Sequence, residues 1–133
     1  MAEIEQGIFA RLSGQTGVTN LVDKKIYAGV APQGVGLPYI TFFKVSESQP
    51  HAMIGDPSIL RPRIQVSCWS TDYSQIKSIA SAIRTALQDY SATTGGITFQ
   101  RILYEDETNI TEVDPDTNKI IYQVAQDYFA WHN

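Results

Sequence analysis

The stretch that decides the fold is RIQVSCW at residues 63–69, followed closely by DYSQIKSIASAIRTALQDY at residues 72–90. In the first part every second residue is apolar, which is the period-two pattern of a half-buried strand. In the second part apolar residues recur three and four positions apart, which predicts a helix over Tyr73–Tyr90 with one apolar face. Asp72 is a preferred N-cap residue, and Gln75 three positions later predicts a capping box. The stretch therefore predicts a strand that leads into an amphipathic helix.

The residues before this stretch predict another helix and another strand. Apolar residues at helical spacing indicate a helix over 3–13, and residues 18–21 allow one more turn before an extended start at 26–27. Glycines and prolines crowd residues 28–38, which favours a shaped loop. Residues 39–45 are aromatic and β-branched, as expected of a strand.

Two strands are expected after the helix, near residues 97–104 and 120–131. The last is apolar on both parities, which predicts burial on both faces, either between layers or against another subunit. Gln126 and Asp127 interrupt its pattern and predict a bulge. A long polar loop is expected over residues 46–58, and loops of this length are often functional.

The expected fold is a single domain over residues 1–133 of the α+β class. Its elements run in the order α-β-β-β-α-β-β, with a mostly antiparallel sheet of about four to five strands and two main helices packed on one face. A chain of 133 residues is the size of one ordinary domain. No repeat at a fixed period and no low-complexity segment is visible.

Composition excludes several classes of protein. With 43% hydrophobic and 18% charged residues, the chain is neither disordered nor collagen-like, and its apolar runs are too short to span a bilayer. The first six residues carry acids where a signal peptide needs bases, so we expect no export and no membrane, and with a single cysteine a reducing cytoplasm is the default location. A net charge of −4 argues against a protein that grips nucleic acid by its backbone.

Acidic residues are concentrated in one segment between the last two strands. Six acids and no base occur from residue 105 to residue 118, which predicts an acidic loop that ends in a turn at residues 114–118. The loop is either a solvated hairpin loop or a negative surface for a partner or a passage for polyanion. Its acids are Glu105, Asp106, Glu107, Glu112, Asp114 and Asp116.

Catalytic and ligand-binding patterns are missing from the sequence. The two histidines, His51 and His132, do not fall in a recognisable nucleophile motif, and Cys68 lies on the inward parity of its strand, as a buried residue would. Residues 114–118 imitate the start of a calcium loop, but Lys119 stands where that loop needs glycine. We therefore expect no enzyme activity, no metal and no cofactor.

One segment resembles a known family. KIYAGVAPQG at residues 25–34 and LPYI at residues 37–40 resemble the signature of the tail completion or tail terminator proteins of long-tailed bacteriophages and prophages. Weaker similarities follow in order, in residues 63–69, in Tyr73 at the start of a helix, and in QDYF at residues 126–129. The similarity covers most of the chain, although only residues 26–40 are specific.

The resemblance implies a structural part of the virion tail. Such proteins form a ring, usually of six subunits, that caps the tail tube and presents it to the head connector protein. The implied partners are the chain itself, the tail tube protein and the head connector protein, and DNA passes through without specific binding. A ring needs two different patches on each subunit. Candidate interface residues lie in the mid-chain loop and the last strand: Gln49, His51, Met53, Ile54, Phe129 and Trp131. Some of the six acids are expected to line the passage or contact a neighbour.

Three other functions remain open on the sequence. A head-completion adaptor on the connector side would share the size, acidity and lack of catalytic motifs. A small binding module, responsive to calcium or another small ligand, would show itself by calorimetry or thermal shift. An enzyme with an unrecognised site would depend on residues such as the two histidines.

Overall fold

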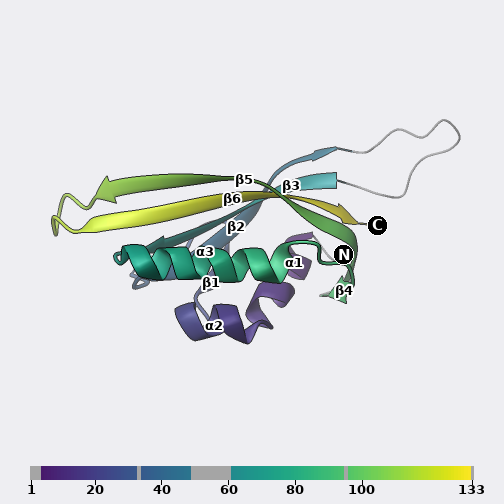
Figure 1. Cartoon of the computed structure of the whole chain (residues 1–133), viewed down its shortest axis with the longest axis horizontal. Helices are drawn as coiled ribbons and strands as arrows, with labels where there is room; N and C mark the ends of the chain where they lie inside the picture. The colour runs from purple at the N-terminus through teal and green to yellow at the C-terminus, as the bar shows by residue number, and fades with distance from the viewer. Residues whose placement is uncertain (1–3, 33, 49–60, 95, 133) are drawn as a thin grey trace, which may run out of the picture.

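The computed structural model describes residues 4–32, 34–48, 61–94 and 96–132. In this part of the chain, three helices lie on one side of a twisted six-stranded sheet (Figure 1). The helices are α1 (Ile4–Ser13), α2 (Thr16–Val22) and α3 (Tyr73–Leu87). The strands are β1 (Ile26–Ala28), β2 (Tyr39–Ser48), β3 (Arg61–Ser70), β4 (Thr93–Thr94), β5 (Ile97–Val113) and β6 (Ile120–His132). The predicted α+β class, with helices on one face, is confirmed.

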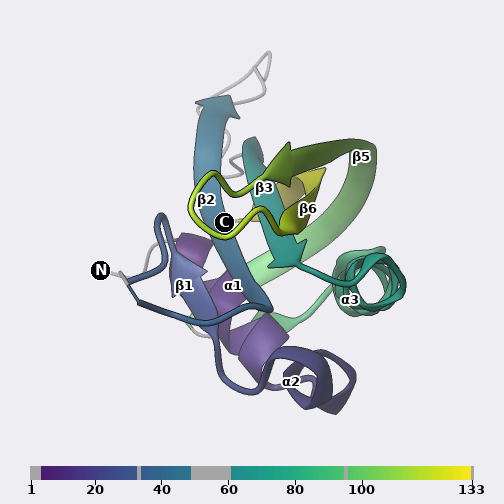
Figure 2. The ribbon, with the colours of Figure 1, turned by 90° about the vertical axis from the view of Figure 1, so that its left-hand side faces the viewer.

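The sheet has the strand order β1-β2-β3-β6-β5-β4. Every neighbouring pair is antiparallel except β1 and β2, which are parallel. The predicted number of strands, four to five, was therefore too small. β1 and β4 are only three and two residues long, which is too short to give a sequence pattern. Figure 2, a view along the sheet, shows how strongly it curls, with the helices α1, α2 and α3 beneath it.

The core lies between the helices and the inward face of the sheet. Ile8 and Leu12 of α1 and Ile79 and Ile83 of α3 are fully buried against the inward residues of the central strands, such as Val66. Cys68 belongs to the same layer, so its predicted burial is confirmed. Buried side chains of this size each stabilise the fold by about 1.5–3 kcal/mol relative to exposure.

Helix α3 begins as the sequence predicts. The Asp72 carboxylate accepts hydrogen bonds from the backbone N–H groups of Ser74 at 2.9 Å and Gln75 at 3.4 Å. The reciprocal half of the predicted capping box is absent, because Gln75 Oε1 accepts from the Ser70 hydroxyl, and that hydroxyl oxygen accepts from the Asp72 N–H.

The same helix ends three residues earlier than predicted. Its last residue is Leu87, and Gln88 is already extended, followed by Asp89 with a φ of 60°. The chain leaves the helix here because residues 88–90 bond to the edge of β5, where the backbone N–H of Tyr104 donates to Gln88 Oε1 at 2.9 Å.

The acidic segment is a strand, and the prediction of a loop there is wrong. β5 continues through the acids to Val113, and Asp106 to Val113 pair with residues of β6 from Asp127 back to Ile120. Only residues 114–119 form the connection, with Asn118 at a φ of 57°. Alternating burial, the usual sign of a strand, is lost after Tyr104 because all nine residues from 105 to 113 are exposed.

The predicted bulge at Gln126 and Asp127 is also misplaced. β6 keeps an unbroken register with β3 through both residues. The extra residue is Glu105 on β5, where the register shifts between Tyr104 and Asp106. The polar pair in β6 thus marks the place opposite the bulge rather than the bulge itself.

Candidate functional site

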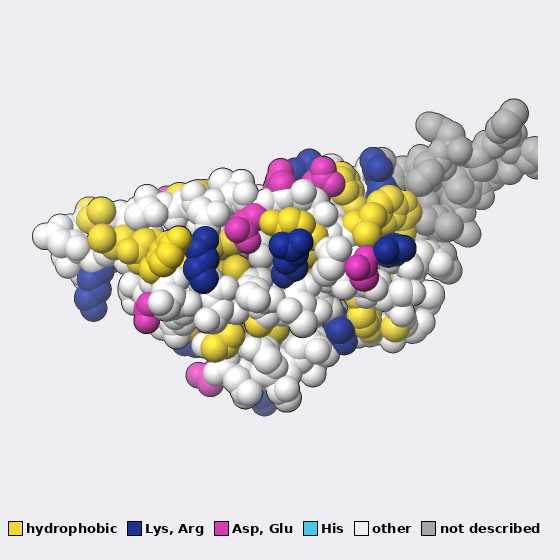
Figure 3. Space-filling model, viewed as in Figure 1, with side chains coloured by type: hydrophobic (Ala, Val, Ile, Leu, Met, Phe, Trp, Pro, Cys, Tyr) yellow, Lys and Arg dark blue, Asp and Glu magenta, His cyan; other side chains and the backbone are white. Residues whose placement is uncertain are grey.

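Among the described residues, the β5–β6 hairpin extends furthest beyond the core. Its connection lies past the first turn of α3 (Figure 1). Val113 is 60% exposed and Ile120, its partner across the hairpin, is 45% exposed. Figure 3 shows uncovered hydrophobic side chains along this projecting end. We call Tyr73, Val113 and Ile120 the hairpin patch, because Tyr73 at the start of α3 contacts Tyr122 of β6 edge to face with ring centroids 5.3 Å apart.

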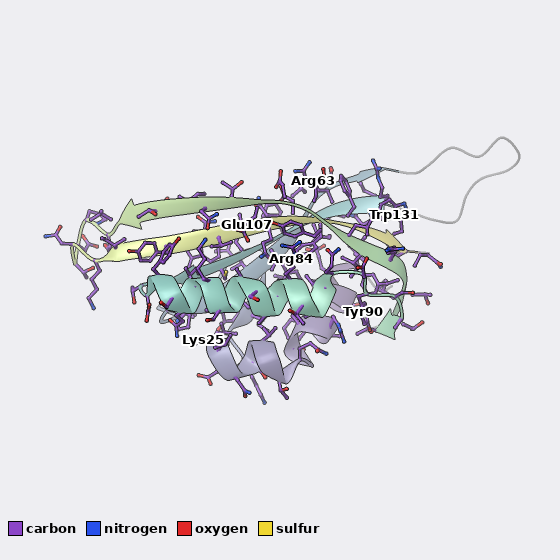
Figure 4. The ribbon with its side chains drawn as sticks, in the orientation of Figure 1. Lys25, Arg63, Arg84, Tyr90, Glu107 and Trp131 are labelled. Carbon is purple, nitrogen blue, oxygen red and sulfur yellow. The ribbon has the colours of Figure 1, made fainter. Side chains whose placement is uncertain are left out.

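One buried side chain holds the hairpin on α3. Gln126 lies on the helix-facing side of β6, and its Nε2 donates at 3.0 Å both to the carbonyl oxygen of Ala80 in α3 and to Glu107 Oε1 in β5. Its Oε1 accepts from the Tyr128 hydroxyl at 2.7 Å. A fully satisfied amide in the core fixes geometry at little cost. Glu107, labelled in Figure 4, is therefore a structural contact of the hairpin as well as a surface acid.

The six acids do not share one face of the hairpin. Glu107 points to the helices, whereas the register places Asp106 and Glu112 on the opposite, outer face of the sheet. Asp114 and Asp116 lie in the connection, where the backbone N–H of Asp116 donates to Asp114 Oδ1 at 2.9 Å. That bond and the Asn118 N–H to Asp114 carbonyl bond make the predicted turn.

An ion pair sits beside the bulge. Arg63 of β3 donates to Asp127 Oδ2 at 2.7 Å and lies 3.9 Å from the Asp106 carboxylate (Figure 4). The hydrogen bond and the charge of Asp127 raise the pKa of Arg63 above its usual value. Desolvation and then the neighbouring Asp127 raise the pKa of Asp106. The bulge thus brings a second carboxylate to one guanidinium.

Phe129 and Trp131 form the second candidate surface, on the outer face of β6. Both are half-buried, and their ring centroids are 6.3 Å apart. The guanidinium of Arg61 lies 4.6 Å from the Phe129 ring centroid and that of Arg63 lies 5.7 Å from it. The predicted burial of β6 on both faces is thus incomplete, since the helix-facing residues are buried and this outer pair is only partly covered by arginines. The other interface candidates, Gln49, His51, Met53 and Ile54, lie outside the described residues.

Two hollows on the described structure are lined partly by aromatic side chains. One of about 490 Å³ lies between α1 and the strands, beside Phe9 and Phe42. Another of about 320 Å³ lies on the outer face, over the stacked rings of Tyr39 and Trp69. Among the described residues no three His, Cys, Asp or Glu side chains come together as metal ligands, and none of the helices is long and apolar enough to cross a membrane. Burial raises the pKa of the Cys68 thiol to about 12, which leaves it unreactive.

The described residues form a small α+β module with a projecting acidic hairpin and exposed apolar residues at its end. The family model described as tail completion protein gp17 matches residues 6–128. The chain belongs to this family, and it is a structural protein of bacteriophage tails.

Comparison with solved structures supports the fold independently. A chain from the virion of a native gene transfer agent (GTA) particle superposes with a TM-score of 0.76 at 11% sequence identity. The match covers 97% of this chain and 93% of that one. No curated protein sequence matches significantly.

Proposed function

We propose that this protein forms a ring of six copies that caps the finished tail tube and joins it to the head connector protein. The observation that carries the proposal is the second half of β5, residues 106–113, whose side chains the fold of the monomer leaves uncovered. All residues of β5 from 105 to 113 are exposed, and Val113 and Ile120 expose apolar surface at its end. A strand whose side chains are not buried by the monomer is available to bind a neighbouring subunit.

The two candidate surfaces lie on different parts of the subunit. The hairpin patch is at the projecting end of β5 and β6, whereas the Phe129 and Trp131 pair is near the other end of β6 (Figure 4 labels Trp131). A closed ring needs unlike surfaces on each chain, one for each neighbouring copy, and surfaces such as these two remain available for the tube and the connector. The tube protein and the connector protein would then contact the two rims of the ring.

The acids of the hairpin fit a passage for DNA. Glu105, Asp106, Glu112, Asp114 and Asp116 are exposed or half-buried, and no base occurs among residues 105–118. A wall of negative charge repels the phosphate backbone and so prevents DNA from sticking as it passes. Ring subunits would be made in the bacterial cytoplasm and used in the virion tail.

Light scattering tests the proposal directly. The mass of the protein is measured alone and after mixing with tubes of the tail tube protein from the same phage. We expect a ring mass, or co-sedimentation with tube ends, when tubes are present. A protein that stays a monomer at high concentration and ignores tube ends would contradict the proposal.

A variant with five of the six hairpin acids neutralised tests whether the acids line a passage for DNA. Glu105, Asp106, Glu112, Asp114 and Asp116 are changed to Gln or Asn, and Glu107 is kept because it bonds Gln126. We expect altered assembly or slower DNA passage in particles that carry this variant. Normal joining of tails to heads with all five acids removed would show that the acids do neither.

The second candidate, a head-completion adaptor, shares these surface features. Fractionation separates the two: a tube cap co-purifies with headless tails, whereas a head adaptor remains with filled heads.

A further inference from the structure

The two halves of β5 differ at the edge that faces away from β6. In the first half this edge is covered: the Ile102 N–H donates to the Tyr90 carbonyl at 3.1 Å, and the Asp89 N–H donates to the Ile102 carbonyl at 2.8 Å. The Tyr104 N–H is bonded by Gln88, and Thr93 and Thr94 of β4 pair with the start of the strand. Past the Glu105 bulge, β5 pairs with β6 alone among the described residues. The second half is therefore an open strand edge.

The register tells which backbone groups point out from this open edge. In antiparallel pairs, residues alternate between bonding their partner strand and pointing away from it. Ile102 and Tyr104 point away, opposite Ala130 and Tyr128, and residues opposite 126, 124 and 122 continue that alternation. The outward N–H and C=O groups are consequently those of Glu107, Asn109 and Thr111.

Among the described residues, the sheet has a second stretch without a partner strand at its opposite end. β1 pairs with β2 only from Ile40 to Phe42, while β2 continues to Ser48. The backbone of Ile40 and Phe42 bonds toward β1, so the same alternation turns the groups of Lys44 outward just beyond it. Phe43, on the outer face, is 38% exposed, and Val45, which the register with β3 skips between Lys44 and Ser46, is 47% exposed.

Charge decides which edge fits which. Two copies cannot join through the open half of β5 in both, because Asp106, Glu107 and Glu112 would face their own kind and like charges across a strand pair destabilise it. The β2 stretch carries one base and one acid, Lys44 and Glu47, in an exposed 3.4 Å contact, so its net charge is zero and it does not repel the acidic edge as a second β5 would. Its outer-face residue Phe43 also offers apolar surface to Ile110, which is 37% exposed on the outer face of β5.

We propose that subunits join by strand pairing, in which the open half of β5 (residues 106–113) of one copy bonds to the β2 stretch at residues 43–47 of the next. Lys44 then lies on the same face as Glu107 of its neighbour, and the apolar residues meet on the outer face. Unlike edges at opposite ends of one sheet make a head-to-tail contact, the kind that closes into a ring. The inference rests on the proposed ring and specifies how its subunits bind one another.

Proline at an outward position tests this pairing. Thr111→Pro removes an outward N–H for which the described residues supply no acceptor, and strand edges tolerate such a proline. Lys44→Pro does the same at the other edge. We expect each variant to fold by circular dichroism and to remain a monomer where the wild type forms rings. Thr111→Val and Lys44→Gln, which keep the N–H, are the matched controls and should still assemble, Lys44→Gln more weakly.

Mixing the two proline variants gives the sharpest readout. Each retains one intact edge of the opposite kind, so an equimolar mixture should form one-to-one dimers by analytical ultracentrifugation and nothing larger. Rings formed by either folded proline variant alone would overturn the proposal. So would a mixture that stays monomeric under conditions in which the wild type alone forms rings.

Lys44→Glu covers the case in which a proline variant does not fold, since it leaves the backbone intact. It places a negative charge opposite Glu107, and we expect assembly to need about tenfold more protein, with the defect reduced by salt. Unchanged assembly of this variant would also overturn the pairing. If the wild type itself never forms rings with or without tubes, the proposed function fails instead.

Discussion

The first and second halves of β5 have the same partner strand and opposite surroundings. From Ile97 to Tyr104 the inward side chains are buried in the core, and the far edge is bonded by β4 and the end of α3. From Asp106 to Val113 every side chain is exposed and the far edge is open among the described residues. One bulged residue, Glu105, separates the two.

The difference shows that one continuously hydrogen-bonded strand can serve two roles. One half packs in the core, and the other presents an exposed surface. The first half is ordered by burial, which the monomer supplies. The second half is ordered chiefly by β6, by Gln126 and by a 2.7 Å bond between Lys77 Nζ of α3 and Asn109 Oδ1. Its surface is free for another molecule.

The largest expected effect comes from one substitution made in each half. Ile102→Ala deletes a fully buried side chain and leaves a cavity, so the free energy of unfolding should fall by about 2–5 kcal/mol. Ile110→Ala, on the exposed half, should change it by less than about 0.5 kcal/mol. Urea denaturation of both variants measures the difference. Equal losses would mean that the second half is also part of the core.

A smaller effect is expected where the hairpin is held on α3. Gln126→Leu keeps the volume but removes the donor to the Ala80 carbonyl and the acceptor of the Tyr128 hydroxyl. Leaving buried polar groups unpaired should cost about 1–3 kcal/mol by the same denaturation assay. Tyr128→Phe with Gln126→Leu removes both partners of one bond and should recover part of the loss. A fully stable single variant would mean that Gln126 does not hold the hairpin.

Cys68 reports whether the second half opens by itself. Its Sγ lies 3.7 Å from the Val124 carbonyl, and Val124 pairs with Asn109. At pH 8 a thiol reagent should label Cys68 only at the rate of global unfolding. Faster labelling would reveal local opening of the hairpin and would weaken the view that Gln126 holds it in place.

The same thiol makes stability depend on alkaline pH. Burial raises the pKa of Cys68 from 9.0 to about 12, so the folded chain binds this proton more tightly than the unfolded one. The stability that results is complete below pH 9 and is lost as the pH rises toward 12. Denaturation of wild type and Cys68→Ala across this range isolates the effect, because only the wild type loses this contribution. Parallel pH profiles for the two would contradict it.

The difference between the two halves of β5 could be predicted only in part from the sequence. Side-chain periodicity predicted β3, α3 and the buried half of β5, because burial imposes a pattern on those residues. It missed the second half of β5, where exposure on both faces removes the pattern and leaves only charge. The turn at residues 114–118 was predicted correctly because its geometry depends on local hydrogen bonds of Asp114 and on Asn118.

The candidate surfaces were predicted only in part. Phe129 and Trp131 stand out in the sequence as aromatic residues on the wrong parity, and the structure leaves both half-exposed. Val113 and Ile120 gave no signal, since isolated apolar residues in a polar segment are common. The open edges could not be predicted at all, because they depend on strand order and on how far β1 and the end of α3 reach.

Hydrogen–deuterium exchange at four outward amides of β5 tests the central claim most directly. In the free protein the Ile102 and Tyr104 amides, bonded by Tyr90 and Gln88, should exchange slowly, whereas the Asn109 and Thr111 amides should exchange fast. In rings on tail tubes all four should be slow. Asn109 and Thr111 amides that exchange as fast in the ring as in the free subunit would contradict the account.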